Sequence, residues 1–88
     1  MISQTFTITN SVGLHMRPAG VFSSAMQRFQ CQTTIIFNGR HIDAKSVLMI
    51  MAAGIVCGSR IELECDGCDE KEALQTASEL IYGGLENV

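Results

Sequence analysis

The chain has 88 residues, of which 47% are apolar, and its formal net charge is −3. This length suits a single domain, residues 1–88, with one core. The six Lys and Arg residues form no run, so we expect no nucleic-acid partner. No apolar run approaches the roughly 20 residues that cross a bilayer, and the first residues do not read as a signal peptide. We therefore expect a cytoplasmic protein that does not insert into membranes.

In residues 2–9, Ile2, Phe6 and Ile8 fall on one side and Ser and Thr residues on the other, which predicts a half-buried strand. Residues 10–13 are then a turn. From Met16 to about Phe29, apolar residues recur at spacings of three and four, which predicts an amphipathic helix. Pro18 suits the first turn of this helix because it has no N–H group to leave unpaired.

His15 lies where this helix is expected to begin, and Arg17 follows two residues later. Helix N-termini attract anions through their free N–H groups, here those of Met16 and Arg17, and they disfavour a protonated imidazole. A neutral imidazole can accept a phosphoryl group, and an arginine can pair with the phosphate oxygens. The pattern therefore predicts a phosphate site with His15 as nucleophile, although a lone histidine is more often structural.

Nothing in the sequence suggests hydrolysis. No Ser–His–Asp or Cys–His pattern, metal cluster or glycine-rich nucleotide loop is recognisable. A site that accepts phosphate without a base for water holds it until a partner removes it. We therefore expect a carrier and not an enzyme, with no cofactor and no metal.

Residues 33–37 and 40–43 read as two strands joined by the hairpin turn Asn38-Gly39. His41 on the second of these strands is interpreted as a surface residue. A short helix follows, with Ser46 as its N-cap and Gly54 as its stop. A buried strand is the alternative for the apolar run over residues 47–53.

Five consecutive apolar residues, 47–51, exceed what one core-facing stripe of a short helix can use. Val47, Leu48 and Met51 are therefore predicted to dock partners, since exposed methionine-rich patches favour adaptable binding. The alternative is a helix that is buried all round. Ser46 is interpreted as a regulatory phosphorylation site, because phosphate is tolerated at a helix N-terminus, or simply as a cap.

Residues 60–66 alternate and predict a third long strand. Asp69 with Glu72 resembles an acidic capping box, which opens a last helix that Gly83-Gly84 ends. The four cysteines, Cys31, Cys57, Cys65 and Cys68, are expected to be reduced thiols. Cys65 and Cys68 form a CxxC that suits a redox or half-zinc site, but an inward strand-end Cys followed by a turn Cys is favoured.

The element order is therefore βαββαβα. This order predicts an α+β, open-faced two-layer sandwich, in which three helices cover one face of a four-stranded antiparallel sheet.

At these residues the chain resembles the HPr family, the histidine-containing phosphocarriers of the bacterial phosphoenolpyruvate-dependent sugar phosphotransferase system. The resemblance covers the whole chain. It rests on Gly13-Leu14-His15 followed by Arg17-Pro18-Ala19, on Asn38-Gly39, and on Lys45-Ser46 with the apolar helix after it. Met16, Gly20 and Met49 depart from the family's usual residues, within the expected docking surface.

The resemblance implies the same sandwich fold and a phosphohistidine on His15 Nδ1. It implies that enzyme I is the donor and that IIA domains of sugar permeases are the acceptors. It also implies that Ser46 is the target of an HPr kinase/phosphorylase, which in some relatives promotes binding to the regulator CcpA. We expect a monomer. Alternatives are a regulatory paralogue, for example of a nitrogen-type branch, an acylphosphatase-like enzyme, and an RNA-binding domain. The last two lack their expected residues.

Overall fold

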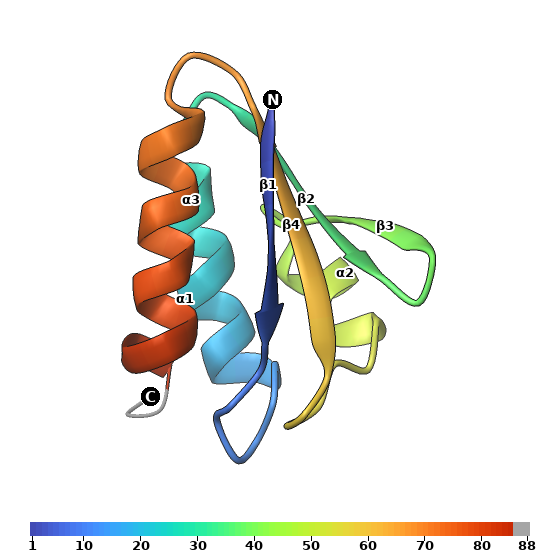
Figure 1. Cartoon of the computed structure of the whole chain (residues 1–88). Helices are drawn as coiled ribbons and strands as arrows, with labels where there is room; N and C mark the ends of the chain where they lie inside the picture. Colours follow the sequence, from blue (N-terminus) through green and yellow to red (C-terminus); the bar gives the residue numbers. More distant parts are fainter. Residues whose placement is uncertain (86–88) are drawn as a thin grey trace.

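The computed structural model describes residues 1–85 and has the predicted element order (Figure 1). The strands are β1 (Ile2–Thr7), β2 (Gln32–Phe37), β3 (Arg40–Asp43) and β4 (Arg60–Asp66). The helices are α1 (Met16–Gln27), α2 (Val47–Ala52) and α3 (Glu70–Glu79), and a π-helical turn, η1 (Leu80–Gly84), continues α3.

The four strands form one antiparallel sheet in the order β1-β4-β2-β3. The pairs Ile2–Cys65 and Thr7–Arg60 mark the ends of the β1–β4 ladder. β2 and β3 are joined by the predicted hairpin, in which Asn38 and Gly39 both have positive φ. Such a two-residue turn matches the twist of the flanking strands. The predicted α+β open-faced sandwich is confirmed.

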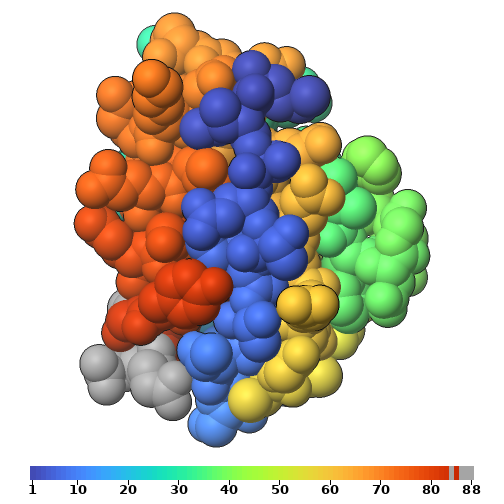
Figure 2. All heavy atoms as spheres, viewed as in Figure 1, coloured from blue at the N-terminus to red at the C-terminus, as the bar shows by residue number. Residues whose placement is uncertain are grey.

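The core lies between the sheet and the helices. Strand residues Phe6, Ile35 and Leu63 are fully buried, as are Phe22 and Met26 of α1. α1 and α3 lie along one face of the sheet, and α2 packs against α1 and β3 (Figure 1). Figure 2 shows β1 lying on the surface between α3 and β4.

The opposite face of the sheet is open. β1 contributes the predicted Ser and Thr residues, namely Ser3, Thr5 and Thr7, all of which are exposed. Ser3 pairs with Glu64 and Thr5 with Glu62, so that β4 adds carboxylates to this face. The open face is therefore more acidic than its Ser and Thr content alone suggests.

Two helix ends differ from the prediction. α1 ends at Gln27, two residues before Phe29, which nevertheless packs partly buried against the core. α3 does not stop as a simple helix at Gly83-Gly84, because it passes into η1. Ile81 and Leu85 are both buried, and their burial holds this last turn against the core.

The predicted capping box of α3 is wrong. The Asp69 side chain caps nothing in its own helix; its carboxylate accepts from the backbone N–H groups of Gln30 at 2.8 Å and Cys31 at 2.9 Å. These bonds, chiefly the one from Gln30, hold the pKa of Asp69 below its usual value. Asp69 therefore ties the start of α3 to the start of β2. Glu70, and not Glu72, reaches back, accepting from the Gly67 N–H at 3.1 Å.

The four cysteines are free thiols in two environments. Cys31 and Cys65 are buried in the core, while Cys57 and Cys68 are exposed. Burial raises the pKa of Cys31 to about 12 and also raises the pKa of Cys65. The favoured interpretation of the CxxC, an inward strand-end Cys65 followed by a turn Cys68, is confirmed. Among the described residues, no helix has the length and apolar character needed to cross a membrane.

Candidate functional site

The loop that leads to His15 is fixed against a second loop, residues 54–59. Gly13 has φ +64°, and a Cβ there would lie 2.6 Å from both the Ile55 carbonyl oxygen and Val56 Cα. Only glycine fits this close approach. The next residue, Leu14, is buried and donates its N–H to the Ile55 carbonyl at 3.0 Å. Gly13 and Leu14, just before His15, are therefore held against residues 55 and 56.

His15 is the N-cap residue of α1, as predicted. Its backbone is extended, and its side chain makes no capping hydrogen bond. The first intrahelical bond runs from the Ala19 N–H to the His15 carbonyl at 2.8 Å. The N–H groups of Met16 and Arg17 come before this bond, and Pro18 has no N–H. Such leading donors, with the helix dipole, form an anion-binding end.

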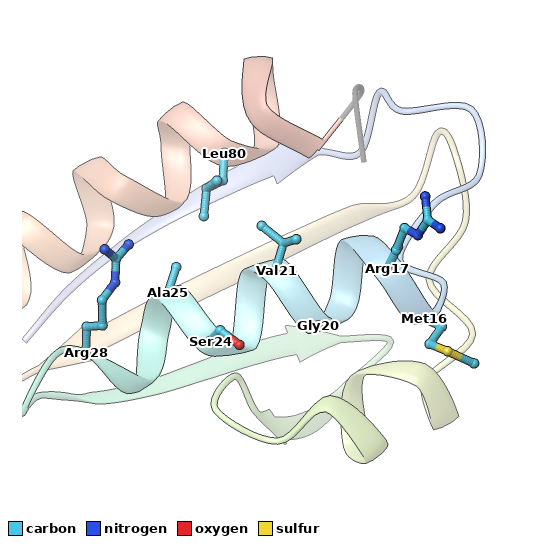
Figure 3. Close-up of a pocket in the computed structure, with 8 residues that line it drawn as sticks. All are labelled: Met16, Arg17, Gly20, Val21, Ser24, Ala25, Arg28 and Leu80. Carbon is cyan, nitrogen blue, oxygen red and sulfur yellow. The ribbon is translucent and has the colours of Figure 1, made fainter.

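The side chains at this helix end face solvent. His15, Met16 and Arg17 are all exposed. Figure 3 shows Met16 and Arg17 projecting from the first turn of α1, with the Arg17 guanidinium away from the helix axis. The imidazole, the guanidinium two residues further on and the free N–H donors of the helix end are all groups that can bind or accept a phosphoryl group.

A hollow of about 650 Å³ runs along α1 on the side of α3. Met16 and Arg17 line one end and Arg28 the other, with Val21 and Leu80 between them (Figure 3). His15 is not among the lining residues. The candidate nucleophile therefore lies on an open surface and not in an enclosed substrate pocket, which suits a reaction between two proteins more than one on a sequestered small molecule.

The short helix after Ser46 is confirmed, and the alternative of a buried strand is wrong. The Ser46 hydroxyl accepts from the Met49 N–H at 3.3 Å, so Ser46 is the N-cap of α2. Ile50 is its one fully buried residue, whereas Leu48 is 75% and Met51 38% exposed. Val47 is half-buried against the core. The helix is thus not buried all round, and its exposed side carries Leu48, Met49 and Met51.

The residues that flank α2 make hydrogen bonds near both ends of α1. At the start of α2, the Gln27 side-chain amide, in the last turn of α1, donates to the Lys45 carbonyl at 2.9 Å. Beyond its other end, Ile55 binds the Leu14 N–H beside His15. Because the 12 residues of α1 span about 18 Å, Ser46 lies near the end of α1 opposite to His15. An effect of Ser46 on His15 must therefore act through partners or through α2, not by direct contact.

Sequence reasoning missed two parts of this site, the burial of Asn10 in the preceding turn and the support from residues 55 and 56. An asparagine at the start of a turn commonly bonds nearby backbone, but the contact between two distant loops leaves no local signal. His41 is exposed on β3, as expected for a surface residue. Within residues 1–85, no group of three or more His, Cys, Asp or Glu side chains is placed to hold a metal ion.

Residues 2–82 match the family model described as "PTS HPr component phosphorylation site". The chain belongs to the HPr family. It is 40% identical over 86 residues to the phosphocarrier protein HPr of Buchnera aphidicola subsp. Acyrthosiphon pisum, an alignment that covers 98% of this chain and 100% of that protein. Members of this family are phosphocarrier proteins of the phosphotransferase system.

Solved HPr structures share the fold. A crystal structure of HPr from Thermoanaerobacter tengcongensis has a TM-score of 0.93 at 32% identity, and it covers 100% of this chain and 98% of that chain. A crystal structure of an HPr dimer from the same organism has a TM-score of 0.77 at 33% identity, over 97% and 98% of the two chains.

Proposed function

We propose that His15 accepts a phosphoryl group from phosphorylated enzyme I and passes it to IIA domains of sugar permeases in the cytoplasm. The first step forms a bond between phosphorus and the imidazole Nδ1 and breaks the bond that held phosphorus on enzyme I. The second step reverses these roles with the acceptor. The observation that carries the proposal is the position of His15 as the exposed N-cap of α1, in a family of phosphocarriers.

The surroundings of His15 support retention of the phosphoryl group. The N–H groups of Met16 and Arg17 and the Arg17 guanidinium supply donors for its oxygens. No described carboxylate or second histidine is hydrogen-bonded to His15 to activate water. The phosphoryl group then remains until a partner protein brings a stronger acceptor.

Partner docking is assigned to the exposed residues of α2 together with Met16, and the protein acts as a monomer. Leu48 and Met51 present apolar surface, to which half-buried Val47 adds its outer edge. Ser46 is the proposed target of an HPr kinase/phosphorylase, and a CcpA-like regulator is a partner of that form. A phosphate on Ser46 places negative charge beside the apolar docking residues, so it changes which partners bind and leaves the chemistry of His15 intact.

Incubation with enzyme I and labelled phosphoenolpyruvate tests the proposal. We expect an acid-labile label on the wild-type protein and on His41→Ala, and none on His15→Ala. Absence of label on the wild type, or an equal label on His15→Ala, would contradict it. For Ser46, labelling with ATP and an HPr kinase/phosphorylase is expected in the wild type and absent in Ser46→Ala.

A further inference from the structure

Asn10 closes the turn before His15 from inside the protein. Its side chain is only 2% exposed, although asparagine is found mostly on protein surfaces. The Asn10 carboxamide Nδ2 donates to the Gly13 carbonyl oxygen. The Asn10 main-chain carbonyl in turn accepts from the Gly13 N–H at 3.0 Å. Both polar groups of the Gly13 main chain are thus bound to this one residue.

The carboxamide also places a second polar atom, Oδ1, in the protein interior. Asn10 Oδ1 is buried and has no hydrogen-bond partner among residues 1–85. A buried acceptor without a partner has lost its hydration and gained no bond in exchange. The bond to the Gly13 carbonyl is therefore the one hydrogen bond that the Asn10 side chain makes among the described residues.

The bond to Gly13 acts at the most adaptable point of the loop. Glycine has no Cβ to restrict rotation, so the Gly13 peptide needs outside partners to keep one orientation. The Leu14 N–H on its far side is held by Ile55. Among the side-chain hydrogen bonds of the described residues, the one from Asn10 is the only one that reaches residues 11–14. Asn10 therefore binds the carbonyl oxygen of the Gly13–Leu14 peptide, and Ile55 binds the N–H of the same peptide.

We propose that Asn10 is a positioning residue for phosphoryl transfer, an inference that rests on the proposed function of His15. By holding the Gly13 carbonyl inward, the carboxamide fixes the direction from which the chain enters α1. It thereby sets where the His15 imidazole lies relative to Arg17 and the leading N–H groups of the helix. A shift of about 1 Å in such an arrangement costs a reaction roughly 100-fold in rate.

Two variants and one control separate positioning from general support. Asn10→Ala removes the carboxamide, while Asn10→Leu keeps a similar size but has no donor. Thr33→Val is the matched control. Thr33 lies in β2, is 1% exposed, and its Oγ1 is also buried without a partner among the described residues. It therefore reports the effect of removing a buried, unpaired polar atom away from His15.

Single-turnover transfer from phosphorylated enzyme I is measured alongside thermal unfolding. We expect both Asn10 variants to transfer about 10- to 100-fold more slowly than the wild type. The KM for enzyme I should not change, because buried Asn10 offers no docking surface. Thr33→Val should keep the wild-type rate. Across the Asn10 variants, the loss of transfer rate should not follow the decrease in unfolding temperature.

A wild-type rate in Asn10→Leu would overturn the inference, as would an equal loss of rate in Thr33→Val. The wild-type protein offers a test that needs no variant. The Asn10 side-chain amide protons should exchange with solvent far more slowly than those of exposed Gln75, and equal exchange would also overturn the inference. A wild type that enzyme I cannot phosphorylate at all would instead contradict the proposed function itself.

Discussion

Gly13 and Val56 are 43 residues apart in the chain, yet a Cβ on Gly13 would lie 2.6 Å from Val56 Cα. The loop before α1 is therefore in backbone contact with the loop that follows α2. The hydrogen bond from Leu14 to Ile55 makes the same connection at the next residue. The loop that carries the proposed acceptor is thus joined to the C-terminal end of the proposed docking helix.

We predict that Gly13→Ala is more destabilising than the matched change Gly54→Ala. Both glycines have positive φ, +64° and +72°, which costs other residues about 1–2 kcal/mol. Only Gly13 also meets backbone, since no atom lies within 4 Å of a Cβ on Gly54. Urea unfolding measures both free energies, and equal losses would show that the contact between the two loops is loose.

Ser46→Ala should lower the free energy of unfolding by about 1 kcal/mol, because α2 loses its N-cap. Ser46→Asp should keep the wild-type stability, since Asp caps as well as Ser and its charge suits the helix N-terminus. Chemical denaturation of the three proteins checks this order. If Ser46→Ala were as stable as the wild type, the hydrogen bond to the Met49 N–H would not be a working cap.

The Asp69 carboxylate should make the free energy of unfolding depend on pH in the acid range. Its pKa is lowered in the folded protein, so its contribution is complete above the ordinary carboxyl range near pH 4 and is lost as the pH falls through the lower folded-state pKa. We expect Asp69→Asn to lower the unfolding midpoint at neutral pH and to flatten the loss of stability in acid.

Glu72→Gln is the matched control for this prediction, because Glu72 was expected to form a capping box that is not present. It should leave the unfolding midpoint unchanged. Denaturation curves between neutral pH and pH 2 distinguish the two residues. An effect of Glu72→Gln as large as that of Asp69→Asn would argue for the box and against the Gln30 and Cys31 contacts.

The cysteines should divide into two pairs when the native protein meets a thiol reagent. Cys57 and Cys68 are exposed and should react quickly. Cys31 and Cys65 are buried and have raised pKa values, so they should react only after unfolding. Mass spectrometry of a brief alkylation reads this pattern directly. Rapid modification of Cys65 would mean that the sheet opens beside β1.

Much of the fold follows from local patterns in the sequence. Alternation and the Asn38-Gly39 turn predicted the strands, and Ser46 predicted the start of α2, because caps and turns depend on residues that are close together in the chain. The capping box failed for the opposite reason. Asp69 found better donors on Gln30 and Cys31, residues brought near only by the folding of β2 beside β4.

The candidate site likewise has features that could be predicted from the sequence and features that could not. The position of His15 at the start of α1 could be predicted, since Pro18 and the apolar spacing after it locate the helix. The burial of Asn10 and the support from Ile55 and Val56 could not, because they depend on packing between distant loops. The half-burial of Val47 was missed as well, since an apolar run does not reveal which of its residues turn inward.

The fate of the phosphoryl group on the purified, phosphorylated protein distinguishes a phosphocarrier from a hydrolase. We expect the label to stay on His15 when the protein is incubated alone at neutral pH. We also expect rapid movement of the label to an added IIA domain, with little release as inorganic phosphate. Release of inorganic phosphate at the same rate with and without the IIA domain would contradict the proposed function, because water and not the partner would then take the phosphoryl group from the imidazole.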